Sequence, residues 1–244
     1  MQTITARYPP PRFTEPPHGE YLYAGWSVDP PRHAPIVRPS ARRDRVLDQC
    51  RALARDARTI DGVADATVFQ AVLLPPLEGL PRFDITLLIR ATTPEVLARV
   101  RSSRPWQRLN AEFVMTARNT RRIGDTDRTR SATFLFNHFT ADDPVNAVRV
   151  WEELAGWYTA KAGVDNSTLL QPTGEGPYAL VNYVRLPHGA TRFLLAQLSR
   201  PSLHTFVRRT LRHNGMVALP VLCTPEQWQN PEPTLRGGRG HGWA

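Results

Sequence analysis

The sequence has almost no lysine, only two cysteines and no long apolar run, and each scarcity narrows what it can encode. Lys161 is the only lysine among 31 basic residues, so the net charge of +9 rests on arginine. This arginine-for-lysine skew is typical of a GC-rich coding sequence. The arginines are scattered rather than clustered with aromatic residues, so the charge does not favour a nucleic-acid partner.

Cys50 and Cys223 lie far apart in the sequence and belong to no Cys/His cluster with the spacing of a metal site. We therefore expect two buried free thiols and no metal. The sequence also lacks GxSxG, P-loop and HExxH motifs, and a GxGxxG motif after a strand. A catalytic site must therefore be inferred from the fold.

No run of about 18 apolar residues is present, so we expect neither a transmembrane helix nor a membrane partner. Residues 1–7 lack the apolar core of a secretory signal, and we expect a cytoplasmic protein. The 244 residues are 41% apolar, which suffices for one large domain or two small ones.

The second half of the sequence has the clearer pattern of strands and helices. Asp143 and Pro144 supply a carboxylate N-cap and a proline at the first helical position, and an apolar stripe predicts a helix over 144–162. A proline divides the later helical region at Ser199–Pro201. Four strands flank these helices, over residues 133–139, 167–171, 178–185 and 216–222. The order β-α-β-β-α-β is that of a ferredoxin-like unit.

The first half carries a fainter copy of this pattern. Residues 1–39 are rich in proline, which predicts an extended arm with strand-forming residues only at 21–28; a disordered leader is the alternative. Ser40 can cap one helix and Pro94 can open another. Strands are expected over residues 67–74, 83–90 and 113–117.

These patterns divide the chain into five segments. We expect an arm over 1–39 that adds one strand, a first ferredoxin-like unit over 40–117, a linker over 118–130, a second unit over 131–225 and a flexible tail over 226–244. The polar linker is either a solvated connection or an ordered loop over a pocket mouth.

Three short matches, in the same order in both halves, indicate an internal duplication. Residues 61–67 match 162–168, residues 83–90 match 178–185, and the Ser-Arg-Pro at 103–105 matches that at 199–201. One such match arises easily by chance, whereas three in register do not.

A duplicated ferredoxin-like unit resembles the dimeric α/β-barrel superfamily, here with both halves in one chain. The resemblance covers about residues 20–224 and rests on element order and the repeat, not on a signature motif. It implies an α+β fold in which two sheets form an intramolecular barrel with helices outside. It also implies relatives among cofactor-free antibiotic-biosynthesis monooxygenases, chlorite-dismutase-like haem proteins and dye-decolourising peroxidases. Gly124–Asp127 departs from the GxxDG element expected of the peroxidases.

Polar residues inside strands are the candidate site residues. Five of them occur on two strands, within 133–139 and within 178–185, and Arg90 closes a third strand over 83–90. Buried polar groups need partners, so these residues either satisfy one another or face a pocket. We assign Asn137, His138, Tyr183 and Arg185 as candidate catalytic residues, and Asn182 and Arg90 as candidate substrate-binding residues. A hydrogen-bonded structural role is the alternative for His138.

Strand alternation predicts the face on which each of these residues lies. In the first half the apolar face is Phe83, Ile85, Leu87 and Ile89, which we expect beneath helices. Arg90 then points into the barrel, and by the repeat Tyr183 and Arg185 do so too. Asn182 is left pointing at the helices, which conflicts with a site inside the barrel.

Two inward arginines, Arg90 and Arg185, each need a counter-ion or an anionic ligand. Asp84 lies on the same face as Arg90 and can neutralise it, whereas Ala179 occupies that place in the second half. We therefore expect the pocket on the side of the second unit, lined by Tyr183, Arg185 and His138, with a preference for an anionic or enolisable ligand.

Three functions are compatible with the sequence. The resemblance implies a monooxygenase-like enzyme that holds an apolar small molecule in the barrel and needs no cofactor. A haem or other ligand-binding protein, with His138 as the candidate ligand, is the second function. The third is a non-catalytic scaffold or interaction protein with a solid barrel. A monomer and a homodimer are both compatible with the sequence.

Overall fold

The structure is a computed structural model, which describes residues 7–32, 35–126 and 132–226. The first half contributes β1 (Phe13–Thr14), β2 (Glu20–Trp26), α1 (Ala41–Arg58), β3 (Val63–Leu73), β4 (Ile85–Ala91), α2 (Pro94–Ser102), α3 (Arg104–Leu109) and β5 (Phe113–Ile123). The second half contributes β6 (Phe134–Ala141), α4 (Pro144–Ala162), β7 (Ser167–Pro172), β8 (Leu180–Arg185), α5 (Ala190–Leu198), the π-helix η1 (Leu203–Val207), α6 (Arg208–His213) and β9 (Met216–Pro225).

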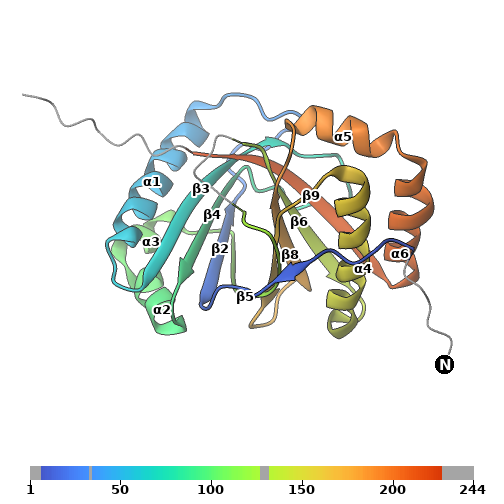
Figure 1. The fold of residues 1–244 in the computed structure, drawn as a ribbon. Helices are drawn as coiled ribbons and strands as arrows, with labels where there is room; N and C mark the ends of the chain where they lie inside the picture. Colours follow the sequence, from blue (N-terminus) through green and yellow to red (C-terminus); the bar gives the residue numbers. More distant parts are fainter. Residues whose placement is uncertain (1–6, 33–34, 127–131, 227–244) are drawn as a thin grey trace, which may run out of the picture.

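Eight of the described strands close into one antiparallel barrel (Figure 1). Around the barrel their order is β5-β2-β4-β3-β9-β6-β8-β7, and β7 pairs with β5 to complete the ring. The β3–β9 and β5–β7 pairings join the two halves of the chain. Helices α1, α2 and α3 cover one side of the barrel and α4, α5 and α6 cover the other, as the superfamily resemblance implies.

Corresponding elements occupy corresponding places in the two halves. The strand order is β5-β2-β4-β3 in the first half and β9-β6-β8-β7 in the second, which is the same order when the strands of each half are numbered in sequence. Thr67 pairs with the residue two before Arg90, and Thr168 pairs with the residue two before Arg185. The register therefore places the two arginines, and the two threonines, at equivalent positions.

The interior of the barrel is filled by side chains from both halves, and many of them are aromatic. Buried rings of the first half are Tyr21, Tyr23 and Phe69, and those of the second half are Phe134, Phe136 and Tyr183. The ring centroid of Phe136 lies 5.0 Å from that of Phe69, 5.5 Å from that of Tyr23 and 5.6 Å from that of Tyr183. Such ring pairs stabilise the core beyond their buried area. The halves thus share one hydrophobic core.

The strand β5 extends further than the sequence indicated. It was expected to end at Ala117, but it continues to Ile123, and residues 118–123 of the expected linker pair with β7. The polar character of this segment misled the prediction, because Arg118 and Arg121 alternate with buried residues and point outward at the seam between the two halves. Residues 127–130 of the linker, residue 131 of the second unit, and 227–244 of the expected flexible tail lie outside the described residues.

The helix signals in the sequence are confirmed. Ser40 Oγ accepts a hydrogen bond from the backbone N–H of Arg43, and Asp143 Oδ1 accepts bonds from the first turn of α4. The proline at 201 divides the later helical region as expected, although the segment that follows begins as a π-helix. Both cysteines are buried free thiols.

The described part of the proline-rich arm, from Arg7 onward, lies across the second half. Tyr8 packs edge-to-face on Phe206, with ring centroids 4.8 Å apart. Gly156 of α4 lies so close to the arm that a Cβ atom there would come within 2.7 Å of the carbonyl oxygen of Pro9. A larger side chain at this position would displace the arm. The arm therefore ties the start of the chain to helices formed much later in the sequence.

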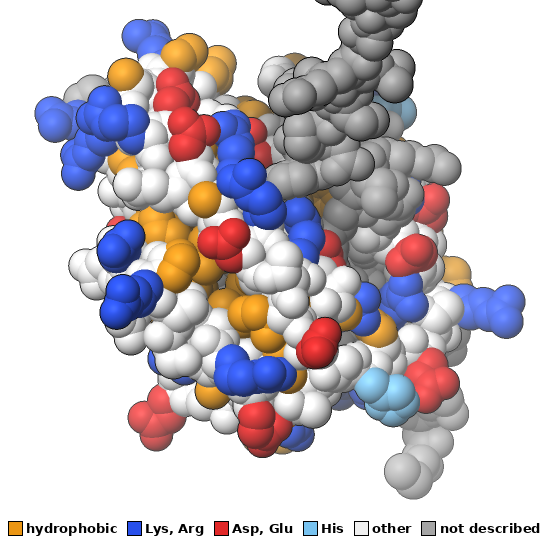
Figure 2. Space-filling view, turned by 90° about the vertical axis from the view of Figure 1, so that its left-hand side faces the viewer, with side chains coloured by type: hydrophobic (Ala, Val, Ile, Leu, Met, Phe, Trp, Pro, Cys, Tyr) orange, Lys and Arg blue, Asp and Glu red, His pale blue; other side chains and the backbone are white. Residues whose placement is uncertain are grey.

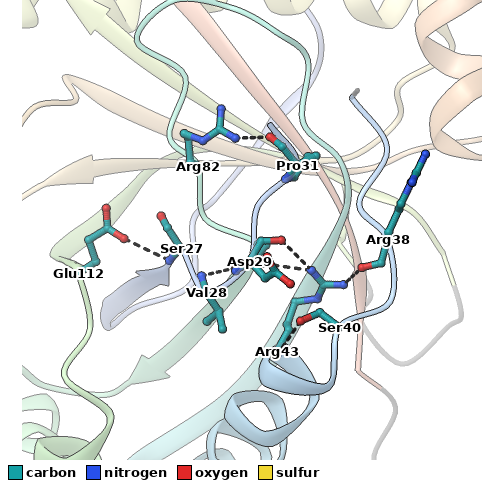
Figure 3. Close-up of polar contacts among 10 residues, drawn as sticks. Ser27, Val28, Asp29, Pro31, Arg38, Ser40, Arg43, Arg82 and Glu112 are labelled. Atoms are coloured by element: carbon teal, nitrogen blue, oxygen red, sulfur yellow. Dashed lines mark hydrogen bonds and ion pairs between the residues drawn. The ribbon is translucent and has the colours of Figure 1, made fainter. Parts of the chain in front are cut away.

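A buried ion pair fixes α1 against the start of β4, and Figure 3 shows its Arg43 side chain. Arg43 Nη1 lies 3.2 Å from Asp84 Oδ2, and these side chains are 1% and 0% exposed. The Asp84 carboxylate also accepts hydrogen bonds of 2.8 Å from the backbone N–H groups of Val28 and Asp29. The expectation that Asp84 neutralises Arg90 was wrong, because α1 supplies a guanidinium to this carboxylate at the opposite end of the strand.

Surface charge is dispersed on the face that carries α1, α2 and α3. Figure 2 shows arginine side chains there interspersed with acidic and polar ones. Within residues 7–32, 35–126 and 132–226, no helix has the length and apolar character needed to cross a bilayer.

The Arg43–Asp84 pair yields a stability prediction. Arg43→Met leaves the Asp84 carboxylate buried without its cation, so we expect a loss of about 3–5 kcal/mol in the free energy of unfolding. Arg42→Met is the matched control, because Arg42 is adjacent and exposed; its expected effect is within about 0.5 kcal/mol. Urea denaturation measures both variants, and equal losses would contradict the assignment.

Candidate functional site

A small cavity lies in the second half, between α4 and the outer face of the barrel sheet. Its volume is about 30 Å3, which is room for one or two water molecules. The polar residues that line it are Asn137 of β6, Ser167 of β7, Asn182 of β8, and Tyr158 and Thr159 of α4. Apolar walls come from α4, α5 and the sheet, and include Phe139, Trp151, Leu154 and Phe193.

The floor of the cavity is a row of polar side chains on three neighbouring strands. Asn137 and Asn182 lie directly opposite each other on β6 and β8, and Ser167 Oγ donates a hydrogen bond to Asn182 Oδ1. Asn137 is 6% exposed. Among the described residues, neither Asn137 Oδ1 nor Thr159 Oγ1 has a hydrogen-bond partner. Leaving such atoms unsatisfied costs about 1–3 kcal/mol each, so they favour a hydrogen-bonding occupant of the cavity.

The first half has apolar residues at the same three positions. Counting in register from the two arginines, Asn137 corresponds to Ala24, Asn182 to Leu87 and Ser167 to Ala66. All three counterparts are 0% exposed and belong to the apolar core under α1. The helix–sheet interface is therefore apolar at these positions in one half, and polar with a cavity in the other. Packing alone does not require that difference.

The aromatic wall contributes one ionisable group, the hydroxyl of Tyr158. Burial of this hydroxyl raises the pKa of Tyr158 to about 12, so it is a neutral phenol at physiological pH. The cavity thus offers neutral donors and acceptors between flat apolar surfaces. Such a set of groups suits an uncharged ring system that carries a hydroxyl or carbonyl group.

The structure divides the candidate residues between two faces of the sheet. Asn137 and Asn182 meet at the cavity, which resolves the conflict that strand alternation left for Asn182. His138 and Tyr183, each adjacent to one of these asparagines in sequence, point to the barrel interior. The residues are therefore not one cluster.

His138 is fully buried inside the barrel and both of its ring nitrogens have partners. Nδ1 lies 3.3 Å from the carbonyl oxygen of Leu219, which can only accept, so Nδ1 carries the proton. Nε2 then accepts a hydrogen bond of 2.9 Å from Tyr23 Oη. Burial lowers the pKa of His138 to about 4, partly offset by the bond to Leu219. His138 is therefore a neutral histidine satisfied within the core.

Aromatic rings close the space around this histidine. Its ring centroid lies 4.9 Å from that of Tyr178, 5.6 Å from that of Tyr23 and 6.3 Å from that of Phe83. Burial also raises the pKa of Tyr23 well above its ordinary value, so the Tyr23–His138 pair stays uncharged. An uncharged pair in this setting stabilises the core.

Arg185 lies at the end of β8, and its backbone is held by Asn166, whose amide bonds both the N–H and the C=O of Arg185. Its side-chain Nε is buried and has no hydrogen-bond partner within the described residues. Arg90 occupies the equivalent position in the first half. The expectation that these residues bind an anionic ligand stays a prediction.

The sequence patterns did not identify Ser167 and Thr159 as site residues, and they did not place Tyr158 at the cavity. Ser167 stands opposite Ala66 in the aligned repeats, so a search for apolar-to-polar changes between the halves would have found it. Thr159 and Tyr158 gave no such signal, because they lie near the end of a helix among other residues of the buried stripe.

The cavity does not fit a haem. No histidine lines the cavity, and both nitrogens of His138 are already bonded on the other side of the sheet. Tyr158 is the one cavity residue of a type that can ligate haem iron, and its raised pKa disfavours the phenolate form. Within residues 7–32, 35–126 and 132–226, no group of three or more His, Cys, Asp or Glu side chains could hold a metal ion.

No protein-family model and no curated protein matches this sequence. Solved structures do match it in fold. An anthrone oxidase-like protein superposes with a TM-score of 0.58 at 12% identity, over 86% of this chain and 92% of that one. A monooxygenase-like protein from Fusobacterium nucleatum gives 0.53 at 7% identity, over 88% and 95%. A chlorite dismutase variant from Candidatus Nitrospira defluvii gives 0.50 at 12% identity, over 88% and 93%.

Identities this low carry information about the fold alone. The closed barrel, the outer helices and these likenesses together show that the chain has the dimeric α/β-barrel fold. They leave its substrate and reaction to be argued from the site.

The low pKa of His138 yields a prediction about pH. A histidine in the unfolded chain has a pKa near 6.5, so as pH falls the unfolded state binds this proton first and stability is lost between about pH 6.5 and pH 4. The difference between the two pKa values corresponds to a loss of about 3 kcal/mol in the free energy of unfolding. His138→Gln should remove this part of the loss between pH 7 and pH 4. Urea unfolding of both proteins measures the difference, and identical pH dependences would refute a neutral buried His138.

Proposed function

We propose that this protein is a small-molecule enzyme of the monooxygenase-like type and that its substrate binds in the cavity beneath α4. The substrate class that suits the cavity is a flat, apolar, enolisable ring compound. This proposal moves the site from the barrel interior, where the sequence had placed it, to the outer face of the same sheet. It keeps Asn137 and Asn182 as site residues.

One observation carries the proposal: the polar trio Asn137, Ser167 and Asn182 replaces an apolar trio at equivalent positions of the first half. A buried polar group that serves no packing role is costly, and such groups concentrate at binding sites. The anthrone oxidase-like and monooxygenase-like proteins of the same fold support an oxidation of a small ring compound.

The chemistry follows from the neutral character of the cavity. An enol or phenol hydroxyl both donates and accepts, which matches the unpaired acceptor Asn137 Oδ1 and the hydroxyl of Thr159. These contacts would select the enol tautomer of an anthrone-like ketone, which is its electron-rich form. Dioxygen would then be the oxidant: the CH2 group becomes C=O, and one O2 yields that carbonyl oxygen and one water. The residues bind and orient the enol, and no cofactor enters the scheme.

A non-catalytic scaffold is the second candidate, and a specific observation favours it. The barrel interior is filled with aromatic rings, and the histidine inside it is fully satisfied. In that case the cavity holds only structural water, and replacing its polar groups by apolar ones of the same shape would be neutral or stabilising.

We also infer that the chain arose by duplication of one ferredoxin-like unit. The shared strand order and the shared register of the arginines support this inference. It explains why a comparison between the halves identifies the residues that have diverged.

The activity test uses dithranol, a dihydroxyanthrone, in air-saturated buffer. We expect the protein to accelerate formation of the quinone with one O2 consumed per molecule. Thr159→Val keeps the shape of the side chain and removes one hydrogen bond, so kcat/KM should fall about tenfold, or about 1.4 kcal/mol. Absorbance and an oxygen electrode follow the reaction.

Thr86→Val is the matched control, because Thr86 is also buried, at 1% exposure, and its hydroxyl is also without a partner among the described residues. Thr86 lies on β4 in the first half, away from the cavity, so its replacement should leave the rate unchanged. No acceleration over spontaneous oxidation, or the same loss in both variants, would reject the proposed site.

A further inference from the structure

The cavity is too small in this conformation for the ligand class proposed. About 30 Å3 holds water but not a ring, so one of the lining elements must move to admit a substrate. The strands are held by ladders on both sides, and moving one would open the barrel. The movable element must therefore be α4 or α5, the two helices that line the cavity.

Helix α4 is firmly anchored. Its N-terminus has the Asp143 cap and a proline at the first helical position, and Gly163 ends it in the left-handed conformation, with φ of 68°. Seven of its 19 residues are buried, among them Trp151 and Trp157. Its displacement would expose most of the apolar core of the second half.

Helix α5 lacks these anchors. It has nine residues, its N-cap is Gly189 without a side-chain hydrogen bond, and no charged residue complements the helix dipole at either end. Its buried residues are Phe193 and Gln197, and Gln197 Oε1 has no partner among the described residues. Leu195 and Leu198 are 63% and 50% exposed. Phe193 is its one buried apolar side chain, and Ala190 and Leu194 pack only partly buried against the same cluster.

The equivalent helix of the first half shows the contrast. Helix α2 also has nine residues and, like α5, no side-chain hydrogen bond at its N-cap. It differs in that Pro94 stands at its first position, Glu95 lies in its first turn, and Arg99 and Arg101 lie in its last turn. Three of its residues are buried, compared with two in α5. The weak anchoring of α5 is thus specific to the half that carries the cavity.

We propose that α5 is the movable wall of this cavity and that Phe193 determines the size of ligand it admits. The proposal deepens the proposed function, since it takes the cavity to be the ligand site. Phe193 packs among Leu135, Val164, Val184 and Leu222 and lines the cavity. When α5 swings outward on the segments around Gly189 and Ser199, this ring leaves and its volume joins the cavity. The hydrogen-bonded floor and the part of the wall that α4 supplies, with Trp151 and Tyr158, stay in place.

Hydrogen exchange of the ligand-free protein tests the moving wall without any assay of activity. Backbone amides of residues 190–198 should exchange at least about tenfold faster than those of residues 94–102, because regions with few buried contacts open more often. Exchange of α4 should be slower than that of both. Equal protection of α5 and α2 would overturn the proposal, whatever dithranol does.

Two phenylalanine variants test the role of Phe193. Phe193→Ala should increase the rate of uptake of 1-naphthol, read from quenching of tryptophan fluorescence, at least tenfold. Phe206→Ala is the control, because Phe206 is 7% exposed, compared with 5% for Phe193, and does not line the cavity. If the Phe193→Ala protein does not fold, Phe193→Leu takes its place. We expect it to increase the rate of 1-naphthol uptake by a smaller factor.

The outcomes separate the two proposals. Faster uptake in the Phe193 variants alone supports the moving wall, and equal uptake in the Phe193 and Phe206 variants overturns it. If α5 exchanges fast but the protein oxidises no anthrone, the proposal that α5 moves is supported and the proposed enzymatic function is rejected.

Discussion

The structure depends on covering the inner face of each half-sheet. A four-stranded sheet with helices on one side leaves its other side to be buried, and the second sheet of the same chain buries it. The β3–β9 and β5–β7 pairings then remove all free edges from the ring. Rings from both halves interlock in the enclosed space, so neither half has a complete core without the other.

This shared interior frees the outer faces to differ. Because Phe69, Phe136 and Tyr183 already hold the halves together, the interface under α4 can contain polar groups without loss of the fold. In the first half the corresponding interface is apolar, and a buried ion pair between Arg43 and Asp84 secures its helix. Stability and specialised chemistry are thereby assigned to different surfaces of one barrel.

Sequence patterns predicted the barrel, most elements and the facing of the strands, because apolar periodicity and helix caps act locally. Asn182 was placed beneath the helices by alternation alone, and the structure agrees. Two features of the structure were not predicted. Arg43 reaches Asp84 across 41 residues, and no local pattern encodes such a contact. The outward arginines of β5 resembled a linker because exposed polar residues alternate there with buried ones.

The site was only partly predictable for a related reason. Asn137 and His138 are neighbours in the sequence, but a strand sends them to opposite faces, so their proximity in sequence carried no information about a shared pocket. Strand alternation predicted the face on which each side chain lies. Which face can bind a ligand depends instead on where the packed structure leaves space. Packing of Phe and Tyr rings in the barrel decides that, and it cannot be read from one strand.

The long sequence separation of the β3–β9 pairing has a consequence for biosynthesis. Phe69 pairs with Pro225, so the ring cannot close until residue 225 has left the ribosome. At about 5–20 residues per second, the first half waits several seconds or more with Tyr21, Tyr23 and Phe69 uncovered. During that interval the nascent chain exposes a sheet with an aromatic face and unpaired edge strands, which can pair with another chain. A chain of this design therefore relies on rapid pairing of β3 with β9, or on chaperones, to form the barrel.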